Sequence, residues 1–182
     1  MLITMLVAAA LVSSPSYPED QSVKKGETPK PPVEFVTGTA THQQALAWTA
    51  SILCDSNDQA EVRLDLAPHY PVLFAPDRCG SHNTTYFVFG VSHRGYKYLG
   101  MLEDVGAYRV AAPDRNGHPR IVTYYGFGAD DAVLSLEVLG PDGFKEVKRK
   151  NLNESHAEGL PAGFLDSPKP ATAQELQAMF GK

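Results

Sequence analysis

Several residue types and patterns are scarce in this chain, and each scarcity excludes a class of protein. Basic residues are fewer than acidic ones, 16 Lys and Arg against 21 Asp and Glu, so the net charge is −5. This balance argues against nucleic acid as a partner, because phosphate binding needs a basic surface. Only two residues are cysteine, and no second Cys/His pair completes a zinc site near Cys79 and His82. The glycine patterns of phosphate-binding and dinucleotide-binding loops are also missing.

Long apolar runs are missing as well, because the one apolar run at the N-terminus is short. Leu2–Val12 spans about 16 Å as a helix, roughly half of a bilayer core, which is too short to cross a membrane. Small residues follow it, and cleavage after Ser16 would suit a secretory signal peptide. No Lys or Arg precedes the run, which is unusual for such a peptide, and the alternative is an N-terminal element folded into the core. We expect a secreted or periplasmic protein with no stable membrane anchor.

The chain divides into three parts on this interpretation. Residues 1–16 are the signal peptide, and residues 17–32 form a linker in which Pro29, Pro31 and Pro32 oppose helix and remove backbone donors. Residues 33–182 form a single β-rich globular domain, long enough to bury a core of its own.

Two helices are expected, one at each end of this domain. Thr41 followed by Gln44 fits a capping box, and apolar residues then recur at helical spacing over 42–53. Thr172 followed by Glu175 repeats the motif, and the apolar side chains after it share one face of a short C-terminal helix.

Short β-rich runs separated by turn signals fill the region between the helices. Thr85–Phe89 is the clearest run, and Asn116-Gly117 and Asp142-Gly143 are strong hairpin signals. Connections this short favour an antiparallel meander, because parallel crossovers need about a dozen residues. The predicted fold class is therefore α+β and mainly β: a curved sheet or small sandwich with an N-terminal helix and a short C-terminal helix. The other predicted strands are 96–99, 108–111, 121–125, 132–138 and 144–147, with one or two more within 61–74.

The middle of the chain carries a family resemblance. The order and spacing of several motifs resemble one FG-GAP-type repeat, the unit of a β-propeller blade. These motifs are Tyr98-Leu99-Gly100, Tyr108-Arg109-Val110, the stretch from Asp114 to Val122, and Phe144. With Cys79-Gly80-Ser81-His82-Asn83 upstream, the chain resembles a group of uncharacterised secreted bacterial proteins. The resemblance covers roughly residues 79–147, and its motifs are weakly specific.

The chain departs from the repeat in one loop and in its length. Calcium-binding FG-GAP loops end in an aspartate, whereas Arg120 stands there, and a cation in place of an oxygen ligand disfavours calcium. A blade takes roughly 40–50 residues, so the length from Val33 to Asp166 allows three at most, fewer than a closed propeller needs. We expect no metal and no cofactor.

Cys54 and Cys79 are predicted to form a disulfide if the protein is exported. The bridge would close a loop of about 26 residues and stabilise the fold by roughly 3.5 kcal/mol on the chain-entropy estimate. The alternative is a Cys79 nucleophile with His82 as its base, which would need a free thiolate.

Tyrosine is abundant in the predicted meander. Such rings usually pack across strand pairs, but several on one outward face would form a recognition surface. The candidates for this binding surface are Tyr86, Tyr96, Tyr98, Tyr108, Tyr124 and Tyr125.

These observations favour an exported non-enzymatic domain that binds a protein or glycan partner in the cell envelope, and we assign no catalytic residue. An inhibitor of a cell-wall enzyme is one form of this hypothesis. The rival is a cell-envelope hydrolase or lyase that uses groups such as His82, His93 and Asp114, which would then converge in one pocket. A third candidate is a stabilising subunit of an envelope assembly, which would expose an apolar patch.

Overall fold

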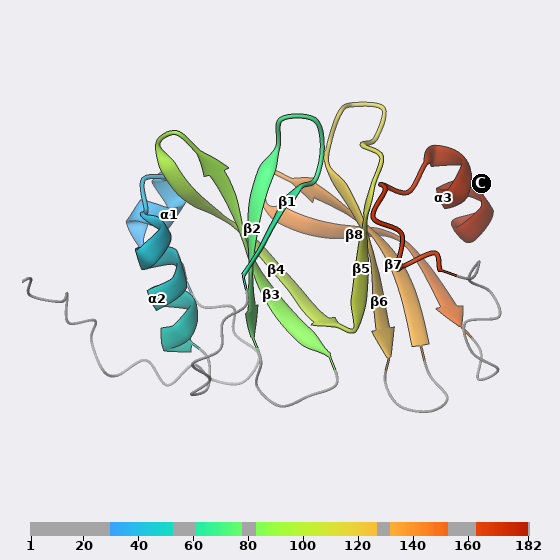
Figure 1. The fold of residues 1–182 in the computed structure, drawn as a ribbon, viewed down its shortest axis with the longest axis horizontal. Helices are drawn as coiled ribbons and strands as arrows, with labels where there is room; N and C mark the ends of the chain where they lie inside the picture. The colour runs from blue at the N-terminus through green and yellow to red at the C-terminus, as the bar shows by residue number, and fades with distance from the viewer. Residues whose placement is uncertain (1–29, 53–60, 78–82, 127–131, 153–162, 182) are drawn as a thin grey trace, which may run out of the picture.

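The computed structural model describes residues 30–52, 61–77, 83–126, 132–152 and 163–181. Within them the chain forms strands through its middle and helices at both ends (Figure 1). The helices are α1 (Val33–Thr37), α2 (His42–Ile52) and α3 (Ala173–Phe180). The strands are β1 (Val62–Asp65), β2 (Pro71–Asp77), β3 (Thr84–Ser92), β4 (Gly95–Val105), β5 (Ala107–Ala111), β6 (Arg120–Gly126), β7 (Ala132–Gly140) and β8 (Gly143–Leu152).

The strands form two antiparallel four-stranded sheets, in the order β1-β2-β3-β4 for sheet A and β5-β6-β7-β8 for sheet B. Within each sheet, strands that are consecutive in the sequence pair with each other, as the short connections predict. Gly140 pairs with Gly143 across a tight turn, and Ser92 pairs with Gly95 across another. The predicted class, mainly β with antiparallel meanders, is confirmed, and its sandwich form is the one observed.

The two sheets pack face to face around an apolar layer that we call the inter-sheet core. Val72, Phe74 and Val88 of sheet A lie in one cluster with Ile121 and Leu139 of sheet B, and all five side chains are buried. Alternate residues of each strand point into this layer because side chains alternate across a pleated strand. Burial of each large apolar side chain stabilises the fold by about 1.5–3 kcal/mol.

The helices cover the outer faces of the sandwich. Trp48 of α2 and Phe35 of α1 pack on Phe87 and Phe89 of sheet A, with the Phe35 and Trp48 rings stacked at 5.0 Å. At the other end, α3 buries Leu176 and Met179 against sheet B, and Figure 1 shows α1 and α2 at the opposite end of the molecule from α3. The layers therefore run helix, sheet A, sheet B, helix.

The capping boxes predicted for both longer helices are present. Thr41 Oγ1 accepts the backbone N–H of Gln44, whose side chain accepts the N–H of Thr41 in return. Thr172 and Glu175 make the same reciprocal pair at the start of α3. The five-residue helix α1 was not predicted, because a helix this short carries too few residues for a periodic pattern.

Gly106 takes the chain from sheet A to sheet B. It lies between the last residue of β4 and the first of β5, and its N–H donates to the carbonyl of Tyr124 on β6. The Asn83 side-chain amide donates to the carbonyl of Gly126 at 2.8 Å, which ties the start of β3 to the end of β6. One residue between strands thus turns a meander into two sheets.

Candidate functional site

A pocket of about 280 Å³ opens at the end of sheet A, beside the β3–β4 hairpin. Its base is Gly90 of β3, which pairs with Val72 on one side and Lys97 on the other. Val88, two residues before Gly90, belongs to the inter-sheet core, so the pocket continues the inward face of sheet A. A Cβ on Gly90 would lie 3.3 Å from the nearest atom of the Leu99 side chain, so the glycine lets Leu99 pack closely against β3.

The β3–β4 turn holds Arg94 at one side of the pocket. Ser92 Oγ donates to the carbonyl of Gly95 and accepts the N–H of Arg94, both at 3.2 Å. Gly95 has a φ of 137°, and a Cβ there would lie 2.5 Å from the carbonyl oxygen of Ala40, so glycine is required. The Ser92 hydroxyl is therefore a turn-forming group.

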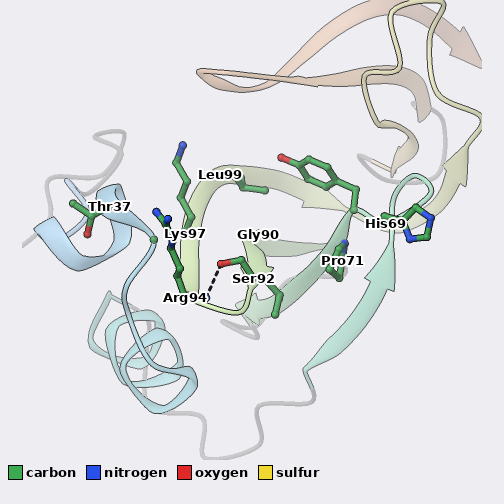
Figure 2. Close-up of a pocket in the computed structure, with 11 residues that line it drawn as sticks. Thr37, His69, Pro71, Gly90, Ser92, Arg94, Lys97 and Leu99 are labelled. Carbon is green, nitrogen blue, oxygen red and sulfur yellow. Dashed lines mark hydrogen bonds between the residues drawn. The ribbon is translucent and has the colours of Figure 1, made fainter.

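The end of α1 closes the same side of the pocket. Gly38 ends the helix in the left-handed region at a φ of 75°, and its N–H donates to the carbonyl of Glu34. Ala40 then pairs with Tyr96 at the free edge of β4, through a Tyr96 N–H to Ala40 carbonyl bond of 2.9 Å. Figure 2 shows Arg94 and Lys97 beside Thr37 on this side, with Gly90 and Ser92 next to them.

The β1–β2 connection forms the opposite side, where Figure 2 places His69 and Pro71. His69 has a φ of 62°, a left-handed conformation that costs a non-glycine residue roughly 1–2 kcal/mol. The next residue, Tyr70, is 37% exposed, and partial burial of its phenol raises the pKa. This loop places the His69 imidazole and the Tyr70 ring at the rim of the pocket, although the backbone conformation at His69 is one that glycine adopts more easily.

The pocket has an uneven charge. Arg94 and Lys97 line it together with His69, and no carboxylate is among its lining residues. Within the part of the chain that the structure describes, neither Arg94 nor Lys97 forms an ion pair. Leu99 and Pro71 supply apolar wall. The pocket can therefore hold an anionic group beside an apolar one.

The six tyrosines proposed as a binding surface do not gather on one face. Each is half-buried and packs against a core cluster, so their rings contribute to the packing of the interior. Tyr96 and Tyr98 pack under the N-terminal helices, Tyr86, Tyr108 and Tyr125 lie at the inter-sheet core, and Tyr124 lies under α3.

Tyr98 has the most unusual surroundings of the six. Its ring meets Trp48 edge-on at 5.0 Å, and its buried hydroxyl has no hydrogen-bond partner among the described residues. Burial raises the pKa of this phenol well above its usual range, and Glu103 raises it further. The group therefore stays protonated.

A buried carboxylate lies beside the inter-sheet core. Glu137 is only 7% exposed, and its Oε1 accepts hydrogen bonds from Tyr125 at 2.5 Å and from Thr123 at 2.8 Å. Burial, followed by the bond to Glu137, raises the pKa of Tyr125. Two donors on one oxygen offset the desolvation of the carboxylate, which makes this cluster a structural one.

The groups of the hydrolase hypothesis do not converge within the described residues. His93 is exposed in the β3–β4 turn of sheet A, whereas Asp114 lies in the β5–β6 connection of sheet B. The hydrogen bond with the His118 side chain is the largest of the effects that lower the pKa of Asp114. Asp114 Oδ1 also accepts two backbone N–H groups, and Arg120 donates to the carbonyls of Ala112 and Pro113. No group of three or more His, Cys, Asp or Glu side chains in these residues is placed to hold a metal ion.

Other predicted features lie outside the described residues. They are Cys54 and Cys79, His82, the signal peptide 1–16 and the linker as far as residue 29. The linker ends at Pro32, whose carbonyl accepts the N–H of Phe35 as α1 begins.

Sequence reasoning missed the pocket residues His69, Tyr70, Arg94 and Lys97. The segment 61–74 was predicted to hold strands, but the His69-Tyr70-Pro71 run between them gave no signal of its own. Arg94-Gly95 was predicted as a turn, and nothing in that pattern indicates that the β1–β2 loop faces it.

Comparison with protein-family models, with curated proteins and with solved structures finds no match for this chain. None of the helices in the described ranges has the length and apolar character needed to cross a bilayer. The function is therefore inferred from the pocket and its chemistry.

Proposed function

We propose that this protein is an exported, non-catalytic domain that binds a protein or glycan partner in the cell envelope, and that the pocket at the end of sheet A receives an anionic group of that partner. The observation that carries the proposal is the pairing of Arg94 and Lys97 at a pocket whose lining includes no carboxylate. Two cations that lack an ion pair within the described residues favour an anion from outside the domain.

The lining favours binding over reaction. Its two aliphatic hydroxyl groups have structural partners: Ser92 bonds within its own turn, and the Thr37 hydroxyl bonds to the carbonyl of Val33 at 3.0 Å. A nucleophile needs a base within hydrogen-bond reach, and these hydroxyls are held instead by backbone groups. An inhibitor of a cell-wall enzyme remains one form of the proposal, with the enzyme as the protein partner.

The test compares what the wild type and two double variants retain from envelope extract of the source cells. Arg94→Ala/Lys97→Ala removes both pocket cations, whereas Arg115→Ala/Lys145→Ala removes two exposed cations from sheet B with the same change in net charge. Saturable capture by the wild type and the sheet B variant, lost in the pocket variant, would support the proposal. Capture that is absent or equal in all three would overturn it.

A further inference from the structure

The pocket combines three properties that restrict the chemistry of its occupant. It is small, it is cationic on one side, and it has apolar surface from Leu99 and Pro71. A volume of about 280 Å³ lies at the lower end of ligand pockets, enough for a terminal residue and little more. A long acyl chain or a nucleotide is too large to be enclosed.

The lining residues also favour a carboxylate ligand over a sugar. Sugar hydroxyls both donate and accept hydrogen bonds, and Asp, Glu, Asn and Gln are the side chains that offer their donors an amide or carboxylate oxygen. None of these four residue types lines the pocket. Arg94 and Lys97 provide donors only, which match an acceptor-only group such as a carboxylate.

We infer that the pocket binds the free C-terminus of a peptide whose last side chain is apolar, with the α-carboxylate at Arg94 and Lys97 and the side chain against Leu99 and Pro71. The inference rests on the proposed function and names its ligand class. Capture of a terminal carboxylate is an established mode of peptide recognition. Gly90 has a part in it, because the absence of a side chain there lets Leu99 pack against β3 as the apolar wall of the pocket.

The experiment titrates labelled full-length protein with acetyl-Gly-Gly-Leu and follows the amide resonances of Gly38, Gly90 and Leu99. Three further probes separate the contributions: the C-terminal amide of the same peptide, acetyl-Gly-Gly-Gly and glucuronic acid. We expect saturable shifts with the free acid, and affinity weaker by about tenfold or more for the amide, since a hydrogen-bonded charge is lost. Loss of the leucine side chain should also weaken binding.

Variants locate the binding. Arg94→Ala/Lys97→Ala should abolish the shifts while the rest of the spectrum stays folded, and Arg115→Ala/Lys145→Ala should leave them intact. Gly90→Val should weaken binding, because its side chain would displace Leu99 from the apolar wall of the pocket. Equal binding of acid and amide, binding that survives in the pocket variant, or glucuronic acid binding as tightly as the peptide would each overturn the inference.

The two proposals fail differently. If extract still yields a partner that depends on Arg94 and Lys97 while the peptide does not bind, the peptide inference is wrong and the proposed function stands. If the pocket variant changes neither result, both are wrong.

Discussion

Arg109 on β5 and Glu175 on α3 form an ion pair, with 3.1 Å between Nη2 of the arginine and Oε1 of the glutamate. The arginine is almost fully buried, and its other nitrogens donate to the carbonyls of Lys169 and Phe164. Its guanidinium also lies 4.6 Å from the centre of the Phe164 ring. One side chain thus ties the C-terminal segment and α3 to the edge of sheet B.

Replacing Arg109 with Met should destabilise the protein by about 2 kcal/mol, because the carbonyls of Lys169 and Phe164 lose their donor, whereas the exposed Glu175 carboxylate is solvated by water. Urea unfolding followed by circular dichroism measures the change. Arg115→Met is the matched control, an exposed arginine whose loss should change stability by less than about 0.5 kcal/mol. Equal stability of the two variants would show that the buried network contributes little.

Gly143 should tolerate alanine much less well than Gly117. Both have a positive φ, but a Cβ on Gly143 would lie 2.8 Å from the backbone carbonyl oxygen of Leu99, whereas a Cβ on Gly117 meets nothing within 4 Å. We expect Gly117→Ala to cost about 1 kcal/mol from backbone strain alone. Gly143→Ala should cost about 2 kcal/mol more, since the β7–β8 turn must move off β4. Melting temperatures of the two variants give the comparison, and similar values would contradict it.

His69→Gly should leave stability unchanged or raise it by up to about 1 kcal/mol, because glycine relieves the left-handed strain at a φ of 62°. Ala67→Gly in the same loop is the control, and it should lower stability by about 0.5–1 kcal/mol through added backbone entropy in the unfolded chain. Thermal unfolding separates the two. If His69→Gly is the more damaging change, the imidazole makes a stabilising contact that outweighs its backbone strain.

Alkaline pH should destabilise the protein through its packed tyrosines. Burial is the main cause that raises the pKa of Tyr108 from 10.0 to about 12, and Tyr98 and Tyr125 shift in the same direction. Because the unfolded chain loses these protons first, the stability they contribute is complete below pH 10 and falls as the pH rises to about 12.

Urea unfolding at a series of pH values, with the ultraviolet absorbance of tyrosinate as a second readout, measures this loss. Tyr108→Phe should flatten part of the decline, while Tyr70→Phe, at a more exposed position, should flatten it less. If Tyr108→Phe leaves the decline in stability unaltered, groups other than Tyr108 cause the decline.

The local elements were predictable because their signals are local. The capping boxes at Thr41 and Thr172 specify helix starts, since each is made by residues three apart. The turn at Asp142-Gly143 and the aromatic run of β3 specify a hairpin and a strand in the same way. The helix α1 was not predicted because its five residues are too few to show a helical repeat of apolar residues. Its packing on sheet A through Phe35 stabilises it.

Local patterns in the chain specify the order of the elements, the antiparallel pairing of consecutive strands within each sheet and the apolar rows that must be buried. Tertiary structure alone decided that the meander divides at Gly106 and folds back on itself, because opposing apolar faces are buried only when the sheets meet. It also decided that Arg109 is interior and that His69 and Lys97 share a pocket. Those outcomes depend on contacts between residues far apart in the chain, and no local pattern records which distant partner a side chain will meet.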